Sequence, residues 1–195
     1  MHYIIGLGNP GEEYKNSRHN TGRIMAEFFC KKEKFLEFEF DKKLKALKAG
    51  GKVGEEKTEV MLPEIFMNKS GISLKPIITN KKKAQFLIVI YDDLDLALGT
   101  FKISFNRGSG GHRGVESIIR ALKTKEFVRV RMGISPATTS GKIKKPQGEK
   151  MVNDFIIGDF KSKELEVIKK VSKKINEALE MIITEGYQKA MSVYN

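Results

Sequence analysis

Three histidines, His2, His19 and His112, carry the only imidazoles of the chain. Imidazole has an ordinary pKa close to neutrality, so histidine is the side chain best suited to accept and return a proton at physiological pH. His2 lies at the terminus, where we expect it to be inert. His19 stands between Arg18 and Asn20, where a loop is expected to meet a helix and core packing is unfavourable. His19 is therefore the candidate general base.

A hydrolytic base also needs a group that orients it, and a carboxylate does this by fixing the tautomer and stabilising the imidazolium. Asp92 is the best candidate because it directly follows the apolar run 86–91. The chain has no Gly-x-Ser-x-Gly motif, and its single cysteine, Cys30, is expected to pack in a helix rather than react. With no covalent nucleophile indicated, an activated water is the simpler hypothesis.

Two asparagines, Asn9 and Asn68, stand in turn motifs. Their amides have the donors to stabilise a developing oxyanion or to hold a substrate amide, and neither task needs a charge. The alternative is that each only stabilises its turn, as asparagine commonly does. Taken singly, each residue favours this second interpretation.

Residues 6–11 match the Gly-x-Gly-x-x-Gly fingerprint of dinucleotide sites. However, Pro10 removes a backbone donor, and Glu12 and Glu13 follow where a pyrophosphate would lie. No second strand ends in an acid about twenty residues further on, as that motif requires. The chain therefore does not favour a nucleotide-dependent enzyme.

Three carboxylates, Asp92, Asp93 and Asp95, are close enough in sequence to raise the question of a magnesium site. Successive residues of an extended chain point to opposite sides, so only some of the three can converge on one ion. We expect no metal and no other cofactor.

The apolar stretches place the candidate residues at one edge of a sheet. Residues 3–7 and 86–91 are typical of buried strands, and the second is the most hydrophobic run in the chain, as expected of a central parallel strand. In open α/β sheets, ligand clefts form at the carboxyl ends of strands. We therefore expect Asn9, His19 and Asp92 to share one cleft.

The remaining pattern predicts an α/β fold with a single domain over residues 1–195. The other expected elements are a helix capped by Asn20 or Thr21, a hairpin or two strands within 41–62, a half-exposed strand at 101–105, a glycine-rich loop at 108–114, a helix at 115–122, a strand at 128–134 and an amphipathic helix at 161–185. The loop 137–148 is the best candidate for a mobile lid.

The chain is strongly basic: 36 lysines and arginines against 24 aspartates and glutamates give a formal net charge of +12. Such an excess on a small domain favours a polyanionic partner such as nucleic acid. The alternative is that the lysine clusters are only solvated loops. No apolar run is long enough for a membrane span and no signal pattern opens the chain, so we expect a cytoplasmic protein without a membrane partner.

Taken together, several stretches resemble the bacterial-type peptidyl-tRNA hydrolases in order and spacing. These stretches are residues 6–11 with Tyr14, residues 18–22, residues 66–71, residues 92–96, residues 110–112 and residues 153–158. The resemblance covers nearly the whole chain. It implies a monomeric α/β domain with a mixed twisted sheet packed between helices. It also implies hydrolysis of the ester that joins a peptide to the terminal ribose of tRNA, with no cofactor.

The resemblance also implies roles for individual residues. His19 would be the general base, Asp92 its support, Asn68 a residue that positions water or substrate, and Asn9 the contact to the peptide. The positions that would bind substrate or tRNA, at its acceptor stem and 3′ end, are Tyr14, Phe66, His112, Lys102 and Arg131.

Arg113 is the most consequential departure, because the family usually has asparagine there. Arginine is always charged and cannot accept a hydrogen bond, so it would bind the terminal phosphate instead or alter the activity. The main alternative is a catalytically silent RNA-binding relative with the same fold. Retention of His19 and Asp92 together with both asparagines argues against this alternative, because binding RNA alone needs no base.

Overall fold

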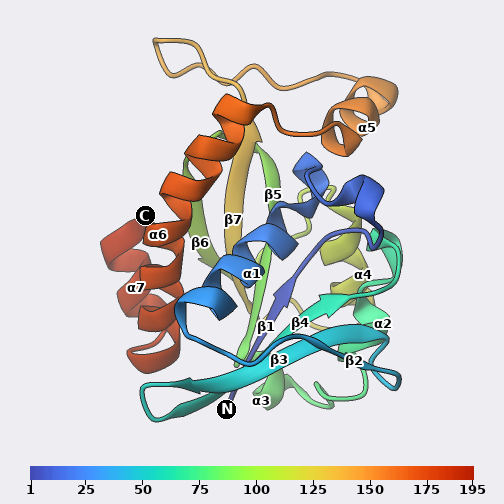
Figure 1. Cartoon of the computed structure of the whole chain (residues 1–195), viewed down its shortest axis with the longest axis vertical. Coiled ribbons are helices and arrows are strands. Elements are labelled where there is room, and N and C mark those ends of the chain that lie inside the picture. Colours follow the sequence, from blue (N-terminus) through green and yellow to red (C-terminus); the bar gives the residue numbers. More distant parts are fainter.

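The computed structural model describes residues 1–195 as a sheet of seven strands with helices on both faces (Figure 1). The strand order is β2-β3-β4-β1-β5-β7-β6. The four central strands are parallel, and β2, β3 and β6 pair antiparallel at the two sides. The strands are β1 (His2–Gly6), β2 (Glu39–Asp41), β3 (Ala46–Val53), β4 (Glu56–Pro63), β5 (Leu87–Ala97), β6 (Phe101–Phe105) and β7 (Val128–Ser135). The expected mixed α/β sheet is confirmed.

Helices cover both faces of the sheet, while α5 stands beyond the carboxyl ends of the parallel strands (Figure 1). The α-helices are α1 (Thr21–Lys32), α2 (Gly71–Leu74), α3 (Lys81–Ala84), α4 (Arg113–Leu122), α5 (Glu149–Ile157), α6 (Ser162–Thr184) and α7 (Tyr187–Tyr194), and the short 3-10 helices are η1 (Glu12–Tyr14), η2 (Arg18–Asn20) and η3 (Met67–Lys69). In Figure 1, α1, α6 and α7 lie in front of the sheet and α4 lies behind it. No helix has the length and apolarity needed to cross a membrane.

The period-two alternation of the central strands produces two cores. Ile88 and Ile90 of β5 join the larger core with α1 and α6, whereas Leu87, Val89 and Tyr91 join the smaller core with α2 and α4. A strand buried on both faces must be apolar throughout, which explains the composition of this run. Cys30 is buried in α1, and burial raises the pKa of its thiol to about 12, so it packs as expected.

Several boundaries differ from the expected ones. The central strand does not end before Asp92 but continues to Ala97, because β7 goes on pairing with it through Asp93 before the register shifts. The short strand β2 and the helices α5 and α7 were not predicted. The residues expected to cap α1 occupy the right position, but Asn20 makes no side-chain cap hydrogen bond there.

Residues 137–148 form an exposed loop that projects at the top of Figure 1 and carries one isolated bridge between Ala137 and Ile143. It leads directly into α5, which has no buried residue. The mobility of this loop remains a prediction.

Candidate active site

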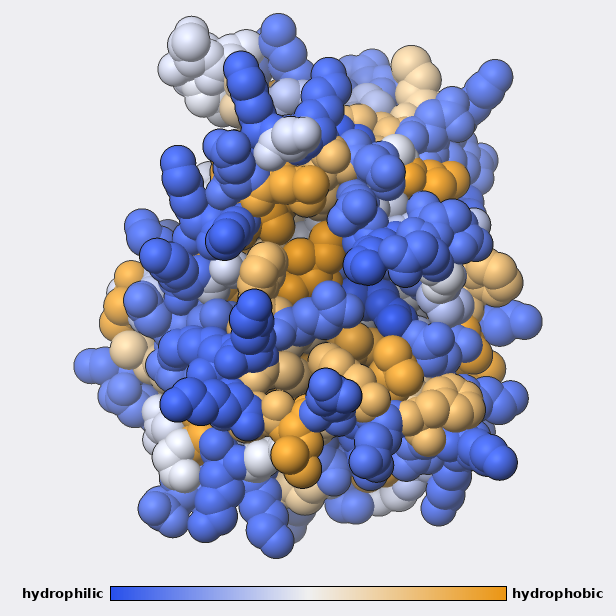
Figure 2. Space-filling view, viewed as in Figure 1, coloured by the Kyte–Doolittle hydropathy of each residue, from blue (hydrophilic) through white to orange (hydrophobic).

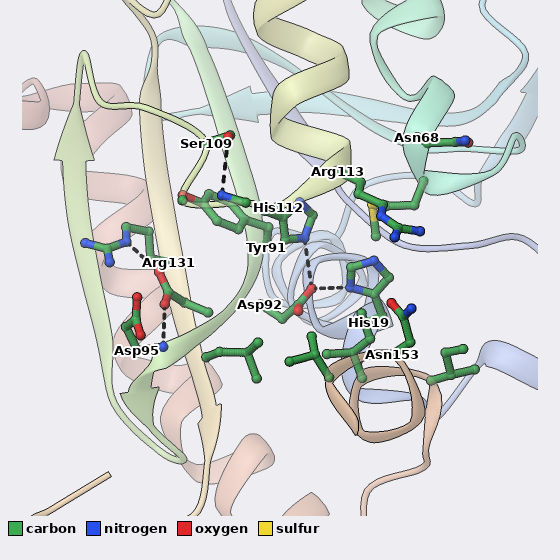
Figure 3. Close-up of a pocket in the computed structure, with 18 of the residues that line it drawn as sticks. His19, Asn68, Tyr91, Asp92, Asp95, Ser109, His112, Arg113, Arg131 and Asn153 are labelled. Carbon is green, nitrogen blue, oxygen red and sulfur yellow. Dashed lines mark hydrogen bonds and ion pairs between the residues drawn. The ribbon is translucent and has the colours of Figure 1, made fainter. Parts of the chain in front are cut away.

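A cleft of about 920 Å³ opens at the carboxyl end of β5. Its walls come from the turn after β1, from η3, from the glycine-rich loop before α4 and from α5. These elements are far apart in the sequence, but all meet where the parallel strands end (Figures 1 and 3). The cleft therefore has the position expected for a ligand site in an open α/β sheet.

His19 is held in η2, immediately before α1. The preceding residue, Arg18, is buried and donates to the carbonyl oxygens of Phe155 at 3.4 Å and Gly158 at 3.1 Å, and pairs with Glu164 at 2.9 Å. These contacts join η2 to the segment around α5. His19 is itself only 8% exposed, so its ring has little freedom.

Asp92 binds two histidines through one oxygen. Its Oδ1 lies 2.9 Å from His19 Nδ1 and 3.1 Å from His112 Nε2 (Figure 3). Burial by itself raises the pKa of the Asp92 carboxyl, but the two imidazoles outweigh burial and hold this pKa well below its usual range. The carboxylate at the floor of the cleft is therefore ionised.

The hydrogen bonds of His112 determine its tautomer. Nδ1 of His112 accepts from the backbone N–H groups of Gly114 at 3.2 Å and Val115 at 3.3 Å, where it caps α4. An accepting nitrogen has no proton, so the proton of neutral His112 is on Nε2 and is donated to Asp92. His19 donates Nδ1–H to the same oxygen, which leaves its Nε2 unprotonated and free of any hydrogen bond within the protein.

The same three side chains, His19, Asp92 and His112, place potential metal ligands within 4.8 Å of one another. A metal needs a lone pair on each coordinating nitrogen, whereas the two nitrogens nearest Asp92 carry protons in the network above. The other nearby carboxylates do not converge on it, because Asp93 binds Arg131 and Asp95 binds Lys145. The geometry therefore fits proton transfer better than metal binding.

Hydrogen bonds to both its side chain and its backbone hold Asn9 in the cleft. Its Oδ1 accepts from the N–H of Met67 at 2.9 Å, and the side chain of Asn20 binds both the N–H and the carbonyl oxygen of Asn9. With Oδ1 used, Nδ2 of Asn9 is the donor left for a ligand. Asn20 thus orients Asn9 instead of capping α1.

Asn68 of η3 and Phe66 just before it line the cleft next to Asn9, and both are exposed. Asn68 makes no side-chain hydrogen bond within the protein, so its amide is free to bind a ligand. Tyr14 is half-buried in η1 and is not among the residues that line the cleft. Its expected contact with substrate remains a prediction.

Of the expected phosphate contacts, Arg131 lines the cleft and its Nε donates to Asp93 at 2.7 Å. Lys102 of β6 lies opposite Arg131 of β7 in the antiparallel strand pair. It is exposed and does not line the cleft. Arg113 lines the cleft and its Nη2 binds Glu149 at 2.9 Å.

The sequence did not predict the roles of three residues of this site, His112, Asn153 and Glu149. It did not anticipate that His112 would bind the carboxylate that orients His19. It also assigned no role to Asn153 or Glu149 of α5, which complete the cleft wall with the apolar residues Val152, Ile156 and Ile157. The stretch 153–158 is one of those that resemble the family, so the sequence did mark this segment as relevant. The resemblance did not indicate that the segment is a helix or that it lines the cleft.

The fold and the site define an α/β protein with a histidine–carboxylate pair of the kind that hydrolases use to activate water. Residues 3–195 match the family model described as peptidyl-tRNA hydrolase. Curated peptidyl-tRNA hydrolases from Thermotoga maritima and Herpetosiphon aurantiacus are 37% identical over 195 residues and 38% identical over 198 residues. The matches cover 98% of this chain and 96% of the Thermotoga protein, and 100% of this chain and 90% of the Herpetosiphon protein.

Among solved structures, peptidyl-tRNA hydrolase from Acinetobacter baumannii superposes with a TM-score of 0.88 at 26% identity, covering 100% of this chain and 94% of that chain. The chain belongs to the peptidyl-tRNA hydrolase family. It is an enzyme that hydrolyses the ester bond of peptidyl-tRNA.

Proposed function

We propose that this enzyme cleaves the ester by direct attack of a water molecule that His19 deprotonates. Nε2 of His19 takes a proton from water, the water oxygen attacks the ester carbonyl carbon, and the ribose hydroxyl leaves with the proton returned by His19. The observation that carries this proposal is the shared oxygen of Asp92, because two N–H donors on it leave Nε2 of His19 as the free basic nitrogen.

Asp92 is the orienting group in this proposal. It holds the His19 tautomer in the ground state and stabilises the imidazolium that forms when water is deprotonated. His112 supports Asp92 and does not itself transfer the proton, because its Nδ1 is occupied by backbone donors.

The two cleft asparagines are assigned to the substrate. Nδ2 of Asn9 binds the peptide portion, and the free amide of Asn68 positions water or the ester carbonyl. The exposed ring of Phe66 provides an apolar surface beside them for the end of the substrate.

We assign Lys102 and Arg131 to the acceptor stem of the tRNA. A-form RNA is recognised mainly through phosphates and 2′-hydroxyl groups, so exposed cations beside the cleft suit it. Lys102 is exposed and lies opposite Arg131 in the antiparallel pair of β6 and β7. Arg131 lines the cleft, with a side chain that is 14% exposed and bound to Asp93. Every group in this mechanism comes from one chain, which supports a monomer.

Single-turnover release of the acyl group from N-acetylaminoacyl-tRNA tests the mechanism. With chelator present, His19→Ala should lower the rate by about 10²- to 10⁴-fold, the usual contribution of a general base, while tRNA binding is retained. His2→Ala is the matched control, because it removes the same chemical group outside the cleft. Full turnover by His19→Ala contradicts the assignment, and binding without release by the wild type would indicate the silent RNA-binding relative.

A further inference from the structure

Arg113 is the first residue of α4 and follows His112, which binds the catalytic carboxylate. Its side chain lines the cleft and is 59% exposed. In Figure 3 it lies on the wall that also carries His112 and projects toward the region of His19 and Asn68. A permanent positive charge therefore stands beside the place where the ester must react.

The one ionic contact of Arg113 is weak. Its Nη2 donates to Oε1 of Glu149 at 2.9 Å, and Glu149 is 80% exposed. Exposed ion pairs of this kind stabilise a protein little, because water screens them and both side chains lose freedom. The other guanidinium donors of Arg113 have no partner in the protein, so an anionic ligand can replace Glu149 at small cost.

The cleft wall carries three other cations, Arg131, Lys69 and Arg107. Arg131 is bound to Asp93 in a pair whose side chains are only 14% and 12% exposed. Lys69 and Arg107 are exposed and have no ionic partner in the protein. Neither of them follows a residue that binds Asp92, whereas Arg113 follows His112. Arg113 is thus the exposed cation whose preceding residue, His112, binds the catalytic carboxylate.

We propose that Arg113 binds the phosphodiester of the terminal nucleotide of tRNA, and that Glu149 is the counterion which this phosphate displaces. The inference rests on the proposed function, in which the terminal ribose ester lies at His19. The phosphodiester of that nucleotide is only a few bonds from the ester, and a guanidinium fork matches phosphate geometry with two parallel hydrogen bonds. The Glu149 carboxylate competes with the phosphate for Arg113. Removing the charge of Arg113 should therefore raise KM, and removing the charge of Glu149 should lower it.

The test compares two N-acetylaminoacyl-minihelix RNAs that differ at one position. One carries the natural phosphodiester before the terminal nucleoside, and the other carries a neutral methylphosphonate there. The wild type should have about a tenfold lower KM for the phosphodiester substrate, with kcat unchanged, as expected for one charge-assisted contact. Arg113→Gln should abolish this difference, and Glu149→Gln should increase it.

Arg120→Gln is the matched control, because it removes the same charge from an exposed position of the same helix outside the cleft. Arg113→Lys keeps the charge without the fork and should retain part of the discrimination. A wild type that treats both RNAs alike overturns the inference, as does an Arg113→Gln variant that keeps the difference or Glu149→Gln that raises KM. The fall in the hydrolysis rate of His19→Ala reports on the proposed function separately, because Arg113 affects only the ratio of the KM values for the two substrates.

Discussion

At the scale of single residues, the site depends on the shared oxygen of Asp92. Two imidazoles bound to one carboxylate oxygen have both ring orientations fixed, and only His19 keeps a ring nitrogen without a partner in the protein. The arrangement differs from an isolated histidine–aspartate pair, because His112 prevents Asp92 from rotating away from its base. Spacing along the chain identifies His19 and Asp92 as candidates, but no local pattern reveals that a helix cap would bind the same oxygen.

The depressed pKa of Asp92 predicts a pH dependence of stability. A carboxyl whose folded-state pKa lies below its unfolded value stabilises the fold above the unfolded pKa, and this contribution disappears as the pH falls through the folded pKa. The stability advantage of the wild type over Asp92→Asn should therefore be present at pH 5 and decrease below a pH of about 4, the unfolded value. Urea unfolding of both proteins at pH 5 and pH 3 measures this, and an advantage that grows at pH 3 contradicts it.

At the scale of elements, the close approach of α1 to the sheet positions His19. A Cβ at Gly22 would lie 2.2 Å from the carbonyl oxygen of Ile90 and 2.5 Å from the backbone nitrogen of Leu7. Only glycine therefore allows the first turn of α1 to contact the residue after β1 and the backbone of β5. This contact places η2, and with it His19, above Asp92.

Gly22→Ala should destabilise the protein, although alanine usually favours a helix. The added methyl group meets backbone atoms of two central strands that cannot move independently, so we expect a loss of about 1–3 kcal/mol or more in the free energy of unfolding. Gly108→Ala is the matched control, because a Cβ there has no neighbour within 4 Å. Urea denaturation measures both, and equal stabilities would show that α1 can shift without cost.

Elements with strong periodicity were predictable, whereas elements formed by long-range pairing were not. The run 86–91 covers the first half of β5 and the stripe of 161–185 coincides with α6, since burial alone requires their apolar patterns. The extension of β5 to Ala97 carries acids that oppose a strand assignment, and pairing with β7 overrides them. α5 is short and has no buried residue, and it meets the larger core only through the partly buried Phe155 and Ile156, so its apolar pattern is weaker than that of α6.

At the scale of the whole molecule, the cleft and some of the positive charge lie at opposite ends of the sheet. Hydrophilic side chains cover most of the face in Figure 2, and the formal net charge is +12. The four parallel strands direct their carboxyl ends toward the cleft and α5, whereas α3 with its lysines lies at the opposite end of the sheet (Figure 1). Only part of the positive charge can therefore contact a tRNA whose 3′ end occupies the cleft.

This separation predicts which lysines determine the salt dependence of tRNA binding. Each phosphate contact releases condensed counterions, so affinity should fall by about tenfold or more between 50 and 200 mM salt, and loss of one contact should lower the slope by about one unit. Lys102→Gln, beside the cleft, should lower the slope, whereas Lys82→Gln, an equal change of charge on α3, should leave it unchanged. Fluorescence anisotropy with deacylated tRNA measures both. Equal effects of the two variants would show that the net charge acts as a diffuse field and that the surface beside the cleft has no special part in binding.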